Sequence, residues 1–142
     1  MNIGSRNSKF GWLWLGLFLI VGVVIEVTLV INKDYAANFS GVEGSVGFTR
    51  ELVRGAHAHG NLLAIINILF GLFIGKAELS DGLKNKGSWL AIISAVLMPI
   101  GMFGLGFGFT PAGALTMLGA ISMIVAVFIV GFGTQGTVKK AL

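Results

Sequence analysis

The chain has no cysteine, few charged residues and only two prolines, and each shortage narrows what the protein can be. Without cysteine it forms no disulfide, thiolate metal site, iron–sulfur cluster or cysteine nucleophile. Charged residues make up 11% of its 142 residues, whereas a soluble domain carries about 25%. This composition argues against a soluble globular protein. Any metal would have to be held by histidine, methionine, carboxylates or a separate cofactor.

Apolar residues, by contrast, are abundant: 55% of the chain is hydrophobic. A helix needs about 20 mainly apolar residues to cross a bilayer, and the chain is long enough for a single domain with four such runs. We therefore predict an all-α integral membrane protein, a four-helix transmembrane bundle, with spans at residues 10–31, 54–75, 88–107 and 111–133. The polar segment 32–53 is predicted to form turns over one end of the bundle.

The ten Lys and Arg residues lie beside the spans, so we read them as topology signals and expect no nucleic-acid partner. With a cytoplasmic N-terminus, the cytoplasmic side holds Arg6, Lys9, Lys76, Lys84, Lys86, Lys139 and Lys140, and the outer side holds Lys33, Arg50 and Arg54. This bias predicts that both termini are cytoplasmic. No transit pattern is present, which favours a bacterial inner membrane.

The second span opens with the densest group of polar residues, and a helical projection separates its faces. At about 100° per residue, a stripe of small and polar side chains shares one direction. Small residues mark where another helix or a flat ligand approaches closely, so this stripe should face a partner. It consists of His57, Gly60, Asn61, Ala64, Gly71 and Gly75. The opposite direction is bulky and apolar: His59, Leu62, Leu63, Ile66, Leu69, Phe70 and Phe73.

His57 is the leading functional candidate, because a histidine in a membrane span usually faces the bundle interior and has a partner. The alternative to a functional role for His57 is a structural hydrogen bond between helices. His59 points elsewhere and suits the headgroup level, and two histidines at i and i+2 cannot share one metal from a regular helix. A single neutral imidazole beside small residues suits an axial haem ligand.

Glu26 is the only acid inside a predicted span, where a charge costs roughly 2.5–3.5 kcal/mol unless it is paired or hydrated. Its depth is comparable with that of His57, so it could accept a hydrogen bond from the ring. Alternatively, it reaches the outer interface or pairs with Arg54. Asn61 lies one turn after His57 and could hold a ligand or bond a neighbouring helix. Asn67 lies on another face, where we expect a structural role.

The Arg54-Gly55-Ala56-His57 element at the start of span two resembles the Arg-Ala-His element of the styrene oxide isomerase family. A polar loop from Lys76 to Lys86 followed by Gly87-Ser88 is also similar to that family's loop before helix three. The spacing between these features matches His57 better than His59. The hydropathy pattern is similar over most of the chain, but the matching residues are confined to these two segments.

The resemblance implies a homotrimer with haem b between subunits and iron bound by His57. Together with His57, we take Gly60, Ala64 and His59 as the candidate cofactor-binding residues. The resemblance further implies that ferric iron acts as a Lewis acid on a small hydrophobic epoxide, which isomerises to an aldehyde. Asn61 and Glu26 are the candidate catalytic residues.

Several features depart from the family's pattern and leave other functions open. The family's asparagine follows its histidine by six residues, where this chain has Leu63, and Ser88–Phe107 lacks the family's tyrosine and aspartate. A haem protein for gas binding or electron transfer therefore stays possible. A small proton-coupled multidrug transporter that uses Glu26 is a further alternative, as is a subunit with only a structural role.

Overall fold

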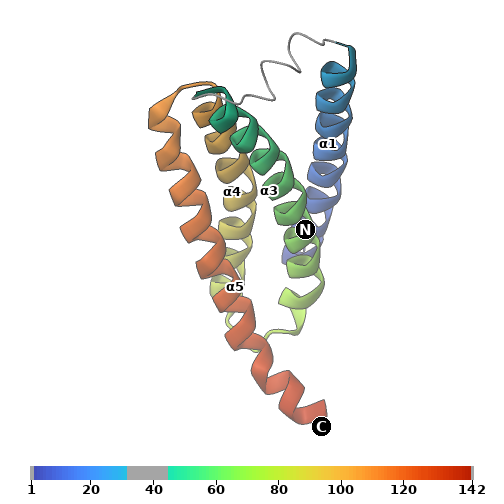
Figure 1. Cartoon of the computed structure of the whole chain (residues 1–142). Coiled ribbons are helices and arrows are strands. Elements are labelled where there is room, and N and C mark those ends of the chain that lie inside the picture. The colour runs from blue at the N-terminus through green and yellow to red at the C-terminus, as the bar shows by residue number, and fades with distance from the viewer. Residues whose placement is uncertain (1, 32–44, 142) are drawn as a thin grey trace.

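The computed structural model describes residues 2–31 and 45–141, and this part of the chain is helical with short turns and no strand. Within these ranges, four helices are long and apolar enough to cross a membrane, which confirms the prediction of an all-helical chain with four long apolar helices. They are α1 (Ile3–Ile31), α3 (Ser45–Phe73), α4 (Asp81–Gly106) and α5 (Gly113–Ala141) (Figure 1). The 3₁₀ helices η1 (Ile74–Lys76) and η2 (Thr110–Ala112) complete the links.

Helices α1, α3 and α4 all begin earlier than the apolar runs predicted, and residues 81–86 of the expected polar loop form the start of α4. Helix α1 starts at Ile3 because its polar first turns form hydrogen bonds with side chains of α3 and α4. Residues 45–53, which the sequence assigned to turns, form the start of α3, so that assignment was wrong. The rest of the predicted turn segment, residues 32–44, lies outside the described residues.

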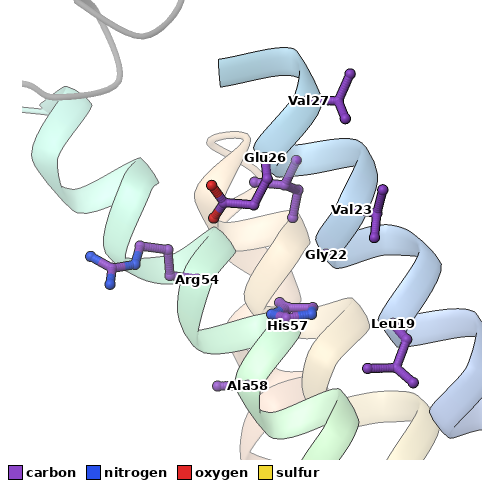
Figure 2. A pocket seen from close by; sticks show the side chains of 9 residues that line it. Leu19, Gly22, Val23, Glu26, Val27, Arg54, His57 and Ala58 are labelled. Atoms are coloured by element: carbon purple, nitrogen blue, oxygen red, sulfur yellow. The ribbon is translucent and has the colours of Figure 1, made fainter. Parts of the chain in front are cut away.

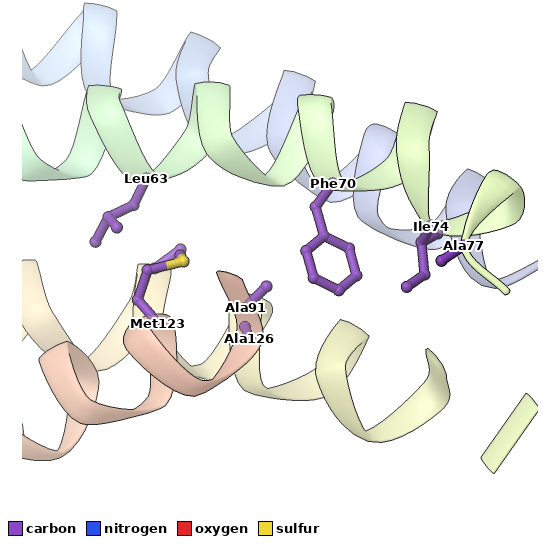
Figure 3. Close-up of a cluster of buried hydrophobic side chains, with 8 residues drawn as sticks. Leu63, Phe70, Ile74, Ala77, Ala91, Met123 and Ala126 are labelled. Carbon is purple, nitrogen blue, oxygen red and sulfur yellow. The ribbon is translucent and has the colours of Figure 1, made fainter. Parts of the chain in front are cut away.

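The helices pack in chain order, α1 against α3, α3 against α4, and α4 against α5. We call the end of the bundle with the α4–α5 turn the Phe109 end, and the opposite end the Arg6 end. The turn at the Phe109 end uses Gly108 with φ of 85°, a conformation that glycine adopts without strain. The hydrophobic core is formed mainly by small alanines of α4 and α5 against larger side chains of α3 (Figure 3).

Glycines bring α1 and α3 into close contact towards the Arg6 end. A Cβ added at Gly4 would collide with the carbonyl oxygen of Gly71, and one at Gly11 would lie 2.7 Å from that of Ala64. Further along, the ring of Phe18 covers Gly60. These contacts confirm that the small stripe of span two faces a partner, which is α1. Gly75 is the exception, since a Cβ there would meet open space.

A buried hydrogen-bond network joins three helices near the Arg6 end. Asn7 Nδ2 donates to Asn67 Oδ1 (2.9 Å) and to the Ser88 carbonyl (3.2 Å), and Ser88 Oγ donates to Asn7 Oδ1. Asn67 Nδ2 also donates to the carbonyls of Leu63 (2.9 Å) and Ala91 (3.0 Å). All three side-chain residues, Asn7, Asn67 and Ser88, are 0% exposed. Asn67 therefore has the structural role that its position predicted.

Arg6 extends this network to the surface. Its Nη2 donates to Ser88 Oγ (2.6 Å) and to Asn85 Oδ1 (2.8 Å), and its guanidinium lies 4.5 Å from the ring centroid of Trp89. The planar guanidinium of Arg6 can stack on the Trp89 ring, and this cation–π attraction is stronger than the one that a lysine ammonium would form there. The start of α1 is thus fixed to the start of α4.

We predict that Asn67→Ala lowers the free energy of unfolding by about 1–3 kcal/mol, because it removes one of the two acceptors of Asn7 Nδ2 and the side-chain donor to the carbonyls of Leu63 and Ala91. Denaturant titration of the detergent-purified protein, followed by tryptophan fluorescence, measures the change. Asn85→Ala removes an exposed acceptor and is the control, with an expected loss below about 0.5 kcal/mol. Equal losses in the two variants would contradict the role of the network.

Candidate functional site

An open pocket of about 590 Å³ lies between α1 and α3 towards the Phe109 end. Beyond the glycine contacts the two helices diverge (Figure 1), and side chains of both line the resulting space. Most of the wall is apolar, with Leu19, Val23, Ile25 and Val27 from α1, while polar groups come from Glu26, Arg54 and His57. Pockets of 300–1,000 Å³ with apolar walls and few polar groups are typical ligand sites.

His57 lies in the wedge where α1 and α3 separate (Figure 2). A Cβ on Gly22 of α1 would lie 2.5 Å from His57 Nε2, so only glycine at this position leaves room for the ring. The sequence analysis missed Gly22. Its signal was the spacing of four residues to Glu26, which places both on one face of α1.

Asn61 lies one turn after His57 on α3 and forms a hydrogen bond with its ring. Asn61 Nδ2 lies 3.1 Å from His57 Nε2. Because an amide nitrogen only donates, Nε2 accepts and the proton of a neutral ring is on Nδ1. Asn61 Oδ1 is buried with no hydrogen-bond partner. A buried carbonyl oxygen without a partner is rare and indicates a place for a missing donor.

Glu26 and His57 line the same pocket, as their equal depth predicted, but no hydrogen bond joins them in the described structure. The carboxylate reaches from α1 towards α3, whereas the guanidinium of Arg54 extends away from α1 (Figure 2). Arg54 instead lies 4.0 Å from Glu51, an exposed pair on its own helix. Neither predicted partnership of Glu26 forms in the described structure, because the helices diverge at this depth and Asn61 is the hydrogen-bond partner of the His57 ring.

The other predicted site residues lie apart from the pocket. Gly60 is buried under Phe18, and the buried Ala64 lies where Gly11 packs on α3. His59 points in another direction, and its Nδ1 donates to the carbonyl of Gly55 (2.8 Å), leaving Nε2 as the acceptor nitrogen of a neutral ring. Met102 of α4 packs against that same glycine, so the face of α3 that carries Gly55 is turned towards α4.

Among the residues that the structure describes, no three His, Asp or Glu side chains gather in a way that would hold a metal ion. A bare ion at His57 would lack protein ligands. A cofactor that brings most of its own ligands needs only the one imidazole that this pocket offers.

We predict that Gly22→Ala displaces the His57 ring, because the added Cβ occupies the space 2.5 Å from Nε2. The chain has two histidines, so the imidazole signals of ¹⁵N-histidine-labelled protein report on each ring by NMR. His57 signals should shift while those of His59 stay. Gly16→Ala is the matched control, since a Cβ there meets no atom within 4 Å. Unmoved His57 signals in Gly22→Ala would refute the contact.

Comparisons of the chain with protein-family models, with curated proteins and with solved structures found no match in any of the three.

Proposed function

We propose that this membrane protein binds haem b in the pocket between α1 and α3, with His57 as the iron ligand. The observation that carries the proposal is a half-buried imidazole in the wall of a largely apolar space of about 590 Å³. The similarity of the Arg54–His57 element to the styrene oxide isomerase family supports the same cofactor.

The residues present fit this group in three respects. In a neutral ring, the hydrogen bond from Asn61 Nδ2 leaves Nε2 of His57 unprotonated, and an axial ligand presents an unprotonated ring nitrogen to iron. Gly22 leaves room for the ring beside α1 at the edge of the pocket. The unpartnered Asn61 Oδ1 offers an acceptor beside the ring. Bound ferric haem supplies a Lewis acid.

The activity we propose is isomerisation of a small hydrophobic epoxide to an aldehyde, which involves no net redox change. The apolar wall formed by Leu19, Val23 and Val27 would hold such a substrate and exclude water. Glu26 and Asn61 are the polar groups that we assign to its oxygen. We further propose a homotrimer in a bacterial inner membrane, for which the exposed apolar faces of α1 and α5 offer contact area to lipid and to neighbouring subunits.

The haem proposal predicts a Soret band in wild-type protein purified in detergent after expression with added haem. His57→Ala should lose the band because the ligand is gone, whereas His59→Ala should keep it. Absorption spectra of the oxidised and reduced proteins measure this, and an unchanged size-exclusion profile shows that each variant is folded. A colourless wild type would refute haem binding, and a full Soret band in His57→Ala would refute the ligand.

A second candidate function is proton-coupled export of lipophilic cations. It is favoured by the Glu26 carboxylate, which lines an apolar pocket and forms no hydrogen bond or ion pair with His57 or Arg54 in the described structure. A carboxylate in such surroundings would attract a cation more strongly than it would in water.

The two candidates assign opposite importance to two side chains. If the protein exports cations, Glu26→Gln abolishes uptake of a fluorescent lipophilic cation into inverted proteoliposomes, and His57→Ala leaves it intact. If the protein binds haem, Glu26→Gln keeps the Soret band. Efflux that is equal in wild type, Glu26→Gln and protein-free vesicles would remove the transporter from consideration.

A further inference from the structure

The amide of the half-buried Asn61 forms one hydrogen bond only, unlike those of the buried Asn7 and Asn67. Its Nδ2 donates to His57 Nε2, and its Oδ1 has no partner. Asn67 on the same helix is held at both ends, because its oxygen accepts from Asn7 and its nitrogen donates to two backbone carbonyls. Asn61 can therefore leave its position at the cost of a single bond.

That single bond has two consequences for His57. It requires the proton of the neutral ring to be on Nδ1, since Nε2 must accept. It also occupies the Nε2 lone pair, which is the one that a metal would use. In the described state the ring has the correct tautomer for a ligand, but its coordinating nitrogen is covered.

We propose that Asn61 is a displaceable cap on His57: it holds the ring in the Nδ1–H tautomer and gives up Nε2 when iron binds. In this role Asn61 is a positioning residue that acts through His57, separately from the contact with the substrate oxygen proposed above. The release of Nε2 to iron rests on the proposed haem function, whereas the control of the His57 tautomer does not.

The cap should weaken haem binding, because its hydrogen bond stabilises the cofactor-free state and is broken on binding. A neutral hydrogen bond of ordinary strength corresponds to about a 2- to 10-fold change in an equilibrium constant. Replacing Asn61 by leucine, which is similar in size and cannot donate, should therefore tighten haem binding by that factor. A residue that contacts bound haem favourably would give the opposite sign.

The first experiment measures the tautomer without any cofactor. ¹⁵N-histidine-labelled protein in detergent, at a pH where both rings are neutral, is compared with Asn61→Leu by ¹⁵N–¹H correlation NMR. His57→Gln assigns the two rings. We expect His57 to be in the Nδ1–H form in wild type and to shift to a mixture or to the Nε2–H form in Asn61→Leu.

His59 is the internal control in the same spectra. Its Nδ1 donates to the Gly55 carbonyl, so it should stay in the Nδ1–H form in both proteins and show that the variant is folded. If Asn61→Leu does not fold, Asn61→Ala takes its place. An Nε2–H form of His57 in wild type, or a His57 tautomer that is unchanged by the substitution, would overturn the proposal.

The second experiment measures the Kd for haem by absorbance titration of the cofactor-free proteins. A Kd lowered about 2- to 10-fold in Asn61→Leu supports the cap. An unchanged or raised Kd overturns the displacement. If neither protein binds haem, the proposed function fails, and the tautomer measurement alone decides whether Asn61 caps His57.

Discussion

The hydrogen bonds among Asn7, Asn67 and Ser88 fix the geometry on which the rest of the bundle depends. Polar groups inside an apolar environment cost several kcal/mol when they lack partners, so these three side chains hold α1, α3 and α4 at one relative position. Arg6 extends the same connection to the surface above Trp89. The Arg6 end of the bundle is therefore specified by polar contacts as well as by packing.

The pocket between α1 and α3 lies beyond the part of the bundle where close contacts hold these two helices together. Close glycine contacts hold α1 against α3 from Gly4 to Gly11, and Phe18 fills the space over Gly60. Past Phe18 the helices diverge, and Gly22 meets an imidazole where the earlier glycines meet backbone. The same helix pair thus provides a rigid contact at one end and an open, largely apolar space at the other.

The two histidines of α3 show how small differences in surroundings separate chemical roles. Both form a hydrogen bond through a ring nitrogen, and they lie two residues apart near the middle of one helix. His59 is bonded to its own backbone at Gly55, whereas the partner of His57 is a side chain that can move. Only His57 lines the pocket, so only its ring can meet a ligand there.

The sequence by itself determined the four apolar helices, the small stripe of span two that faces another helix, and the common depth of Glu26 and His57. These depend on composition and on the 3.6-residue period, which are local properties. It could not reveal the early start of α1, because that depends on partners of Arg6 and Asn7 about 80 residues away along the chain. The contact of Gly22 with His57 and the separation of Glu26 from that ring were likewise decided only by the tertiary structure. The angle between two packed helices sets both, and no local pattern encodes that angle.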